Sequence, residues 1–313
     1  MEKRVTHSME KTKKMNLIGQ LLLFLATLAW GTSFVILKDT IEQVPPMFVI
    51  AIRFLFAGVI MALVFFKKLK VADKYSIVSG VLVGLTVAGA YIAQTYGLTM
   101  TTPGKNAFIT SSYCVMCPFL AWLIIKQKPK AKNIISALLC ILGIGLIALS
   151  GEKASSSSTL LGDALTLVSA VFFAVQIVFI DKFQSKGARS IVLLIFEFLT
   201  AGIIFAIVTL VFEMPVWTIE KYALNGQELL KIGYLALSCT LFAQSAQLIG
   251  QKYTTANQSA LILSLEAVFG MLFSVIMGVE KLSLTLGIGF FIVFISILIS
   301  ELTFGKKLNN KKL

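Results

Sequence analysis

Three ionisable residues lie inside long apolar stretches of the sequence: Arg53, Glu197 and Glu266. A charged side chain is costly inside a lipid bilayer, so such residues usually face a cavity or a partner. Counting 1.5 Å per helical residue puts Glu266 roughly 14 Å into its stretch, near the middle of a ~30 Å hydrocarbon core. A carboxyl group at that depth suits recognition of a cationic group or coupling to protons. Glu266 is therefore the first candidate for a ligand-binding residue.

Tyr113 reaches the same depth at the equivalent position of an internal repeat, so we expect it beside Glu266 in a central site. Arg53 and Glu197 are also equivalent and have opposite charges. Each lies about six residues into its stretch, but from opposite membrane faces, which leaves roughly 12 Å between them along the membrane normal. We therefore expect separate partners, with Arg53 near the outer mouth and Glu197 near the inner one, as gating charges or as residues that order local packing.

Further polar side chains in the apolar stretches are candidates for substrate contacts. Gln244, Gln247 and Gln251 follow helical spacing and mark one polar stripe, which must face protein or water. Hydrogen bonds between helices, without any ligand, are the alternative explanation for such residues. The full set of candidates for substrate binding is Glu266, Tyr113, Trp30, Tyr91, Gln94, Asn106, Ser111, Gln176, Gln244 and Gln247.

The elements that must position these residues follow from composition. The chain has 313 residues, 57% of them hydrophobic and 14% charged, with a mean hydropathy of +0.89. A soluble domain of this length cannot bury so much apolar surface, so we expect an all-α integral membrane protein. Ten stretches are long enough to cross a bilayer: 17–37, 47–66, 76–98, 104–125, 133–150, 161–181, 191–212, 229–251, 257–278 and 284–304.

The distribution of Lys and Arg predicts the topology. With the N-terminus inside, the inside segments hold 21 of the 28 basic residues and the outside segments hold 6, among them Lys38, Lys105 and Lys231. By the positive-inside rule this places both termini in the cytoplasm of a multi-pass plasma-membrane protein, which we expect to be bacterial. The scattered charge suits anionic lipid headgroups and argues against nucleic-acid binding.

Two segments of the chain share one pattern, A-Q-x-x-G-x-x-x-T-T, beginning at Ala93 and at Ala246. "IRFLFAG" at 52–58 likewise parallels "FEFLTAG" at 196–202. Each repeat contains five spans, so the second must start from the opposite side of the membrane, as in inverted-repeat transporters. The sequence thus divides into a basic tail (1–16), a first repeat (17–150), a linker (151–160), a second repeat (161–304) and a second basic tail (305–313).

Within the shared pattern, different positions predict different roles. Thr102 and Thr255 are expected to be helix N-caps, and Gly97 and Gly250 are expected to permit tight hairpins. The paired glutamines, Gln94 and Gln247, lie near opposite faces and are candidate gate or vestibule residues. On the third span, a face of small residues repeats every four positions, which fits packing within a monomer or the contact of a homodimer.

The chain resembles the EamA branch of the drug/metabolite transporter superfamily. The resemblance rests on "LAWGTSFVILK" at 28–38, "RFLFAG" at 53–58, the two Thr-Thr stretches and "LILSLEAVFGMLFSVIMGVEKLS" at 261–283. It implies a ten-helix carrier with two inverted five-helix repeats and a central cavity lined mainly by spans three, four, eight and nine. It also implies alternating access and, more often than not, export of a small metabolite. Cys114 and Ala267 stand where the family usually has proline, and Gln127 stands where it usually has an acid.

Other classes of function fit the sequence less well. The single histidine, His7, lies in the tail, and all four cysteines lie in spans without another soft ligand nearby, so no metal, cofactor or catalytic triad is expected. "TTPGKN" lacks the spacing of a phosphate-binding loop, which argues against an ATP-driven pump. We expect export of an amino acid or a related zwitterionic or aromatic compound. Uptake of a vitamin-like metabolite, a channel and an intramembrane enzyme remain as alternatives.

Overall fold

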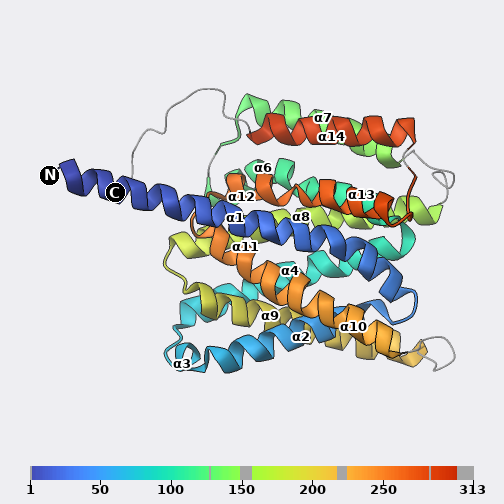
Figure 1. Ribbon diagram of the computed structural model, residues 1–313, viewed down its shortest axis with the longest axis horizontal. Helices are drawn as coiled ribbons and strands as arrows, with labels where there is room; N and C mark the ends of the chain where they lie inside the picture. The colour runs from blue at the N-terminus through green and yellow to red at the C-terminus, as the bar shows by residue number, and fades with distance from the viewer. Residues whose placement is uncertain (1, 127, 149–156, 217–223, 282, 302–313) are drawn as a thin grey trace.

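Helix is the only regular secondary structure in residues 2–126, 128–148, 157–216, 224–281 and 283–301, which the computed structural model describes (Figure 1). Helices suit lipid because each satisfies its backbone hydrogen bonds locally. The first half contains α1 (Glu2–Ile41), α2 (Pro46–Val64), α3 (Phe66–Leu69), α4 (Lys74–Met100), α5 (Pro103–Ser111), α6 (Tyr113–Ile125) and α7 (Ala131–Ala148). The second half contains α8 (Ser157–Ser185), α9 (Ser190–Val208), α10 (Gly226–Tyr234), α11 (Ala243–Gln251), α12 (Ala256–Leu263), α13 (Glu266–Ile276) and α14 (Leu284–Glu301).

Wider or tighter helical turns extend some of these elements. The π-helical segment η1 (Thr209–Glu213) continues α9, followed by the 3-10 turn η2 (Met214–Val216), and the π-helical segment η3 (Leu235–Phe242) joins α10 to α11. The expected linker at 151–160 lies largely outside the described residues, with 157–160 forming the start of α8. The expected C-terminal tail at 305–313 lies entirely outside them.

Eight helical segments are long and apolar enough to cross a membrane. They are Lys14–Ile41, Pro46–Val64, Lys74–Met100, Pro103–Ile125, Thr159–Ser185, Ser190–Glu213, Gly226–Gln251 and Ala256–Ile276. The remaining two expected spans correspond to α7 and α14, whose apolar stretches, Ala131–Leu146 and Leu284–Ser296, are shorter. The protein is therefore a multi-pass membrane protein, with eight candidate spans by length and composition among the described residues.

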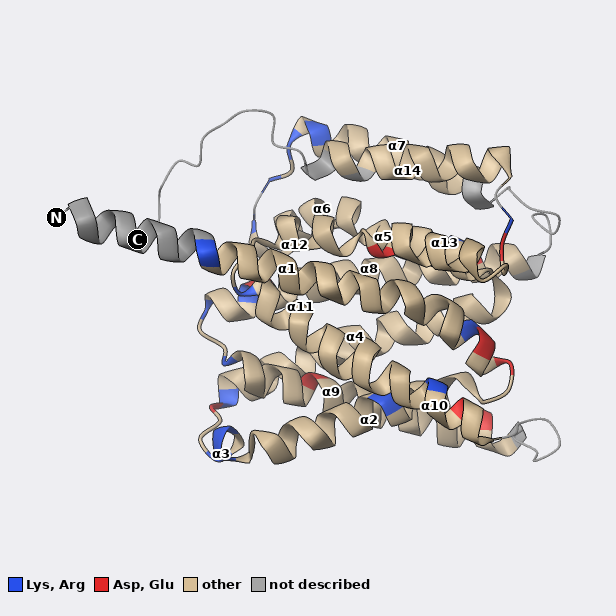
Figure 2. Ribbon diagram, in the orientation of Figure 1, with Lys and Arg blue, Asp and Glu red and all other residues tan. Residues whose placement is uncertain are grey.

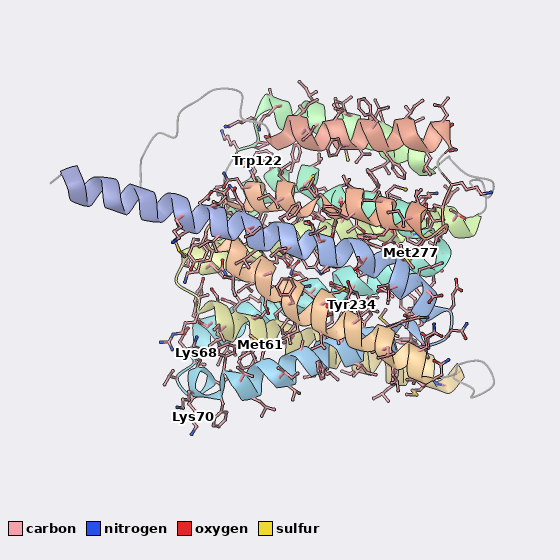
Figure 3. All side chains as sticks on the ribbon, viewed as in Figure 1. Met61, Lys68, Lys70, Trp122, Tyr234 and Met277 are labelled. Atoms are coloured by element: carbon pink, nitrogen blue, oxygen red, sulfur yellow. The ribbon has the colours of Figure 1, made fainter. Side chains whose placement is uncertain are left out.

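The helix axes run in a similar direction, and α7 and α14 form a paired layer at one edge of the bundle (Figure 1). At the opposite edge α2 packs against α9, while α4 lies against both α8 and α9. In the middle α1 contacts α11 and α13, and α13 contacts α5. Trp122 and Met277, labelled in Figure 3, are 48% and 61% exposed, as expected for apolar side chains on a surface that faces lipid.

Closely packed glycines join several of these helices. A Cβ on Gly97 would lie 2.8 Å from the Gly162 carbonyl oxygen, and a Cβ on Gly250 would lie 2.8 Å from the Gly19 carbonyl oxygen. The expectation that Gly97 and Gly250 form hairpins is wrong, because both lie inside helices, α4 and α11. Their function is to let α4 approach α8 and α11 approach α1. Gly80 on the small-residue face packs in the same way against Leu193 of α9, within the chain.

The two Thr-Thr stretches begin helices in different ways. Thr255 caps α12 with a capping box, in which its hydroxyl accepts the Gln258 amide. Thr102 occupies the N-cap position of α5, followed by Pro103, but its side chain makes no capping bond. The Thr102 hydroxyl donates instead to Glu280, whose carboxylate also accepts the Gly104 amide at 2.6 Å. Glu280, four residues after the end of α13, thus binds the start of α5 in place of a local cap.

Spans four and nine are each interrupted near their centre. Ser112 separates α5 from α6, and Ser264 and Leu265 separate α12 from α13. Pro118 lies within α6 rather than at this break, and α13 contains no proline at all. The interruption therefore does not depend on proline, even though Cys114 and Ala267 replace the prolines usual in the family. Each break is followed at once by a candidate site residue, Tyr113 or Glu266.

Lys105 is not a loop residue, contrary to its assignment to an outside segment. It lies in the first turn of α5, and its ammonium nitrogen is 2.9 Å from the Asp163 carboxylate of α8, with both side chains 6% exposed. The Thr101 hydroxyl donates to the other Asp163 oxygen at 2.7 Å. Lys38 and Lys231 likewise lie in helices, α1 and α10. The expected spans 104–125 and 229–251 already contained Lys105 and Lys231, whereas α1 extends beyond its expected end at residue 37 and includes Lys38.

Candidate functional site

A narrow cavity lies at the centre of the bundle, lined by seven of the expected spans from both halves of the chain. Its empty volume is about 550 Å³, but the centre of a water molecule can move through only about 30 Å³ of it, room for roughly two waters. The cavity is lined by Trp30, Ser33, Phe34, Leu37, Arg53, Tyr91, Gln94, Leu98, Tyr113, Phe173, Gln176, Ile177, Gln244, Gln247, Leu263 and Glu266. A polar surface in the middle of an apolar bundle is the arrangement expected of a binding site.

Glu266 and Tyr113 meet in this cavity from the two interrupted spans. Tyr113 is the first residue of α6 and Glu266 is the first residue of α13, so each directly follows the break in its span. The Tyr113 hydroxyl interacts with the Glu266 carboxyl group. Ser111, which does not line the cavity, donates to the same carboxyl group at 3.4 Å. A carboxyl group in the first turn of a helix is favoured by the helix dipole, so the break itself helps to hold Glu266 at this depth.

Aromatic rings form one wall of the cavity. Tyr91 packs edge-to-face against Phe54 at 5.0 Å and Phe173 at 5.5 Å between ring centroids, and Phe173 lies 6.3 Å from Tyr113. The rings thus form a continuous series from Phe54, next to Arg53 in the sequence, to Tyr113, which contacts Glu266. On another side, the Trp30 indole nitrogen donates to the Cys239 carbonyl oxygen at 2.8 Å. These contacts hold large, flat apolar surfaces toward the cavity.

The amide side chains are distributed around the aromatic wall. Gln244 donates to the Tyr91 hydroxyl at 3.3 Å, and Gln94 donates to the Thr110 hydroxyl at 3.1 Å. Gln247 lines the cavity three residues beyond Gln244, as the helical stripe predicts. Asn106 lies outside the lining and donates to Thr166 at 2.7 Å and to the Gln94 carbonyl oxygen at 3.2 Å. It supports Gln94 rather than facing the cavity.

Arg53 and Glu197 have different partners. The Arg53 Nε donates to the Thr240 hydroxyl at 2.9 Å, and Arg53 lines the cavity. Glu197 accepts a hydrogen bond from Gln176 at 3.1 Å and is not among the lining residues. The contact between Arg53 and Thr240 was not predicted from the sequence. Thr240 lies four residues before Gln244, so extending the polar stripe by one turn would have found it.

Other lining residues gave no signal in the sequence. Phe34 and Phe173 are aromatic residues in mainly apolar spans, where nothing in the sequence distinguishes a cavity wall from ordinary packing. Among the described residues, no three His, Cys, Asp or Glu side chains lie close enough together to hold a metal ion. The four cysteines are buried, and none of them forms a disulfide.

The sequence was compared with known families and proteins. A family model described as the EamA-like transporter family matches residues 17–149 and again residues 160–302. The chain belongs to the EamA-like transporter family. An EamA-like relative from Archaeoglobus fulgidus, named an uncharacterized transporter, is 30% identical over 286 residues, covering 91% of this chain and 86% of the relative.

Other EamA-like relatives agree with this assignment. The uncharacterized transporter YoaV of Bacillus subtilis is 21% identical, covering 90% of this chain and 96% of its own. A solved crystal structure has the same fold, with a TM-score of 0.66 at 17% identity, covering 90% of this chain and 96% of that one. The family and the names of these relatives indicate a membrane transporter.

Proposed function

We propose that this EamA-like protein is a secondary transporter that moves a small metabolite across the plasma membrane by alternating access. The observation that carries the proposal is the central cavity, which places Arg53, Glu266 and several amides among aromatic rings inside an apolar bundle. Helices from both halves line it, so relative movement of the halves would change its access. Its small free space means that the helices must move apart to admit a metabolite.

The transporter consists of ten spans in two inverted five-helix repeats, with α7 and α14 as spans five and ten. Reciprocal contacts support this symmetry. A Cβ on Gly58 would lie 2.8 Å from the Leu199 side chain, and a Cβ on Gly202 would lie 2.9 Å from the Leu55 side chain. Gly202 lies 144 positions after Gly58, and Leu199 lies 144 positions after Leu55, so the two contacts are equivalent in the repeats. Such two-way contacts are typical of a two-fold relation, and five spans per repeat give it opposite orientations in the membrane.

The cargo is an amino acid or a related zwitterionic or aromatic compound. The side chains that would bind it are Glu266, Tyr113, Trp30, Tyr91, Gln94, Gln176, Gln244 and Gln247, with Ser111 and Asn106 supporting them and Glu197 as a gating charge. The wall formed by Tyr91 and Phe173 suits an aromatic or apolar side chain. The Glu266 carboxyl group suits an ammonium group or a coupled proton.

In the proposed orientation both termini lie in the cytoplasm of a bacterial cell, and transport runs outward. Figure 2 shows most of the described Lys and Arg at the end of the bundle that carries α3, which corresponds to the cytoplasmic side by the positive-inside rule. Lys68 and Lys70 lie at this end (Figure 3), where they pack over the rings of Phe65 and Phe66. Such basic and aromatic pairs suit the headgroup region.

Counterflow in proteoliposomes tests the proposal. Vesicles are loaded with a mixture of unlabelled amino acids, and uptake of each labelled amino acid is measured from outside. An alternating-access carrier exchanges label faster into loaded than into empty vesicles, whereas a channel does not. Ser33→Trp should block exchange by filling the cavity that Ser33 lines, while Leu237→Trp, at a position half exposed on the lipid-facing surface, should not. Equal uptake into loaded and empty vesicles for every compound would overturn the proposal.

A further inference from the structure

Arg53 is a buried cation with an incomplete set of partners. The residue is 1% exposed and lines the central cavity. Its Nε donates to the Thr240 hydroxyl, which is neutral, and its Nη1 is buried without a hydrogen-bond partner. Across the described part of the chain, no carboxylate forms an ion pair with it. The guanidinium group therefore lies in the membrane interior without a counter-charge.

This arrangement is unfavourable for the empty protein. A buried charge is strongly destabilising unless it is paired and hydrogen-bonded, and Arg presents several donors in a fixed planar fork. Glu197, which occupies the equivalent position in the other repeat, is bonded to Gln176 instead. An anionic group brought in from the cavity would supply the missing partner.

Near Arg53 the cavity also contains a buried hydrogen-bond acceptor without a donor. Thr240, which holds Arg53, and Gln244 are one helical turn apart and therefore share a face. The Gln244 amide nitrogen donates to Tyr91, but its carbonyl oxygen Oε1 is buried and has no donor. The cavity thus offers an unused donor on Arg53 and an unused acceptor on Gln244, and Tyr91 and Glu266 line the same cavity.

We infer that Arg53 is the anchor for a carboxylate of the cargo, and that Gln244 accepts a hydrogen bond from an N–H or O–H group on the same molecule. The inference rests on the proposed transport function and names the group that the site recognises. A singly charged carboxylate fits better than a phosphate, because Arg53 is the one cation and Glu266 the one acid among the lining residues. A dianion there would lack a second cation.

A carboxylate probe and a neutral probe with the same phenylpropyl skeleton test the anchor. The purified full-length protein is titrated with 3-phenylpropionate and with 3-phenylpropan-1-ol at matched ionic strength, and apparent Kd values are taken from the shift in Tm. The native protein should bind the carboxylate at least tenfold more tightly than the alcohol. Arg53→Gln should lower carboxylate affinity about 30-fold or more, since it removes one partner of a buried charge pair, and should leave alcohol affinity unchanged.

Two further variants separate recognition from folding. Arg53→Lys keeps the charge but not the planar fork, so it should retain part of the preference for the carboxylate. Arg189→Gln is the matched control, because Arg189 is half-exposed and pairs with Asp73 away from the cavity. If Arg53→Gln does not fold, Thr240→Val keeps the cation and removes its Nε partner, and should weaken binding of the carboxylate only. Equal binding of the two probes to the native protein would overturn the inference. An unchanged preference for the carboxylate in folded Arg53→Gln or in Thr240→Val would overturn it as well.

The counterflow assay distinguishes this inference from the proposed function. Exchange that is present in the native protein and unchanged by Arg53→Gln would reject the anchor and keep the carrier. Binding of the carboxylate through Arg53, without exchange of any amino acid, would keep the anchor and reject the carrier.

Discussion

The buried ion pair between Lys105 and Asp163 gives a quantitative prediction about stability. The charged atoms are 2.9 Å apart and both side chains are 6% exposed. At an effective dielectric constant of about 20, charges at 2.9 Å attract by about 6 kcal/mol, much of which is offset by the cost of removing both from water. Removing one partner leaves the other charge buried and unpaired, which typically costs about 3–5 kcal/mol.

Asp163→Asn is the most informative single change. Asparagine keeps the shape of the side chain and can still accept the Thr101 hydroxyl, so the main loss is the counter-charge of Lys105. We expect the free energy of unfolding to fall by about 3 kcal/mol or more. Combining it with Lys105→Met removes both charges, so the double variant should be destabilised by clearly less than the sum of the two single changes. The coupling energy should be about 2 kcal/mol or more.

The assay is a double-mutant cycle measured by reversible unfolding in mixed detergent micelles. The same cycle on Arg189 and Asp73 provides the matched control, because that pair is 3.4 Å apart with side chains 54% and 41% exposed. An exposed pair should couple by less than about 1 kcal/mol. A coupling energy for Lys105 and Asp163 no larger than that of the exposed pair would refute the reasoning from burial.

Three further predictions concern packing, coupling and pH. Gly97→Ala should destabilise the protein by about 1–3 kcal/mol, because its Cβ would lie 2.8 Å from a backbone oxygen, whereas Gly145→Ala, with open space around it, should be neutral or slightly stabilising in the same unfolding assay. Glu266→Gln should abolish any dependence of transport on pH, measured as counterflow across a pH series, and a native profile in this variant would exclude proton coupling through Glu266. Asp73 accepts hydrogen bonds from the amide and hydroxyl of Ser76 at the start of α4, which lower the pKa of Asp73. Because the folded-state pKa is the lower one, this stabilisation is present above the unfolded pKa of about 3.9 and is lost as pH falls further; exchange of the first-turn amides of α4, corrected for intrinsic rates, should rise in that range and become insensitive to pH in Asp73→Asn.

Local features of the sequence determined the class of the protein and much of its candidate site. Apolar runs predict helices in lipid because each helix satisfies its own backbone, whatever its neighbours are. Polar residues in those runs are costly at the lipid surface, so Glu266, Tyr113 and Gln244 could be expected to face inward before any contact was known. The same reasoning could not distinguish residues that line the cavity from residues that support the lining. Asn106 and Ser111 are as buried as the lining residues but contact them from behind.

The tertiary structure decided which partners these residues have and where the helices change. Arg53 meets Thr240 across 187 positions, and Lys105 meets Asp163 on a different helix. Neither pairing leaves a local trace, because it depends on how closely two helices approach. Gly97 is an example: its sequence context predicts a turn, but the structure requires glycine there because α8 packs too closely for a side chain. In lipid each helix must satisfy its own backbone hydrogen bonds, so the sequence alone shows where the helices lie. Contacts between helices depend instead on complementary surfaces that are far apart in the chain, and only the tertiary structure defines them.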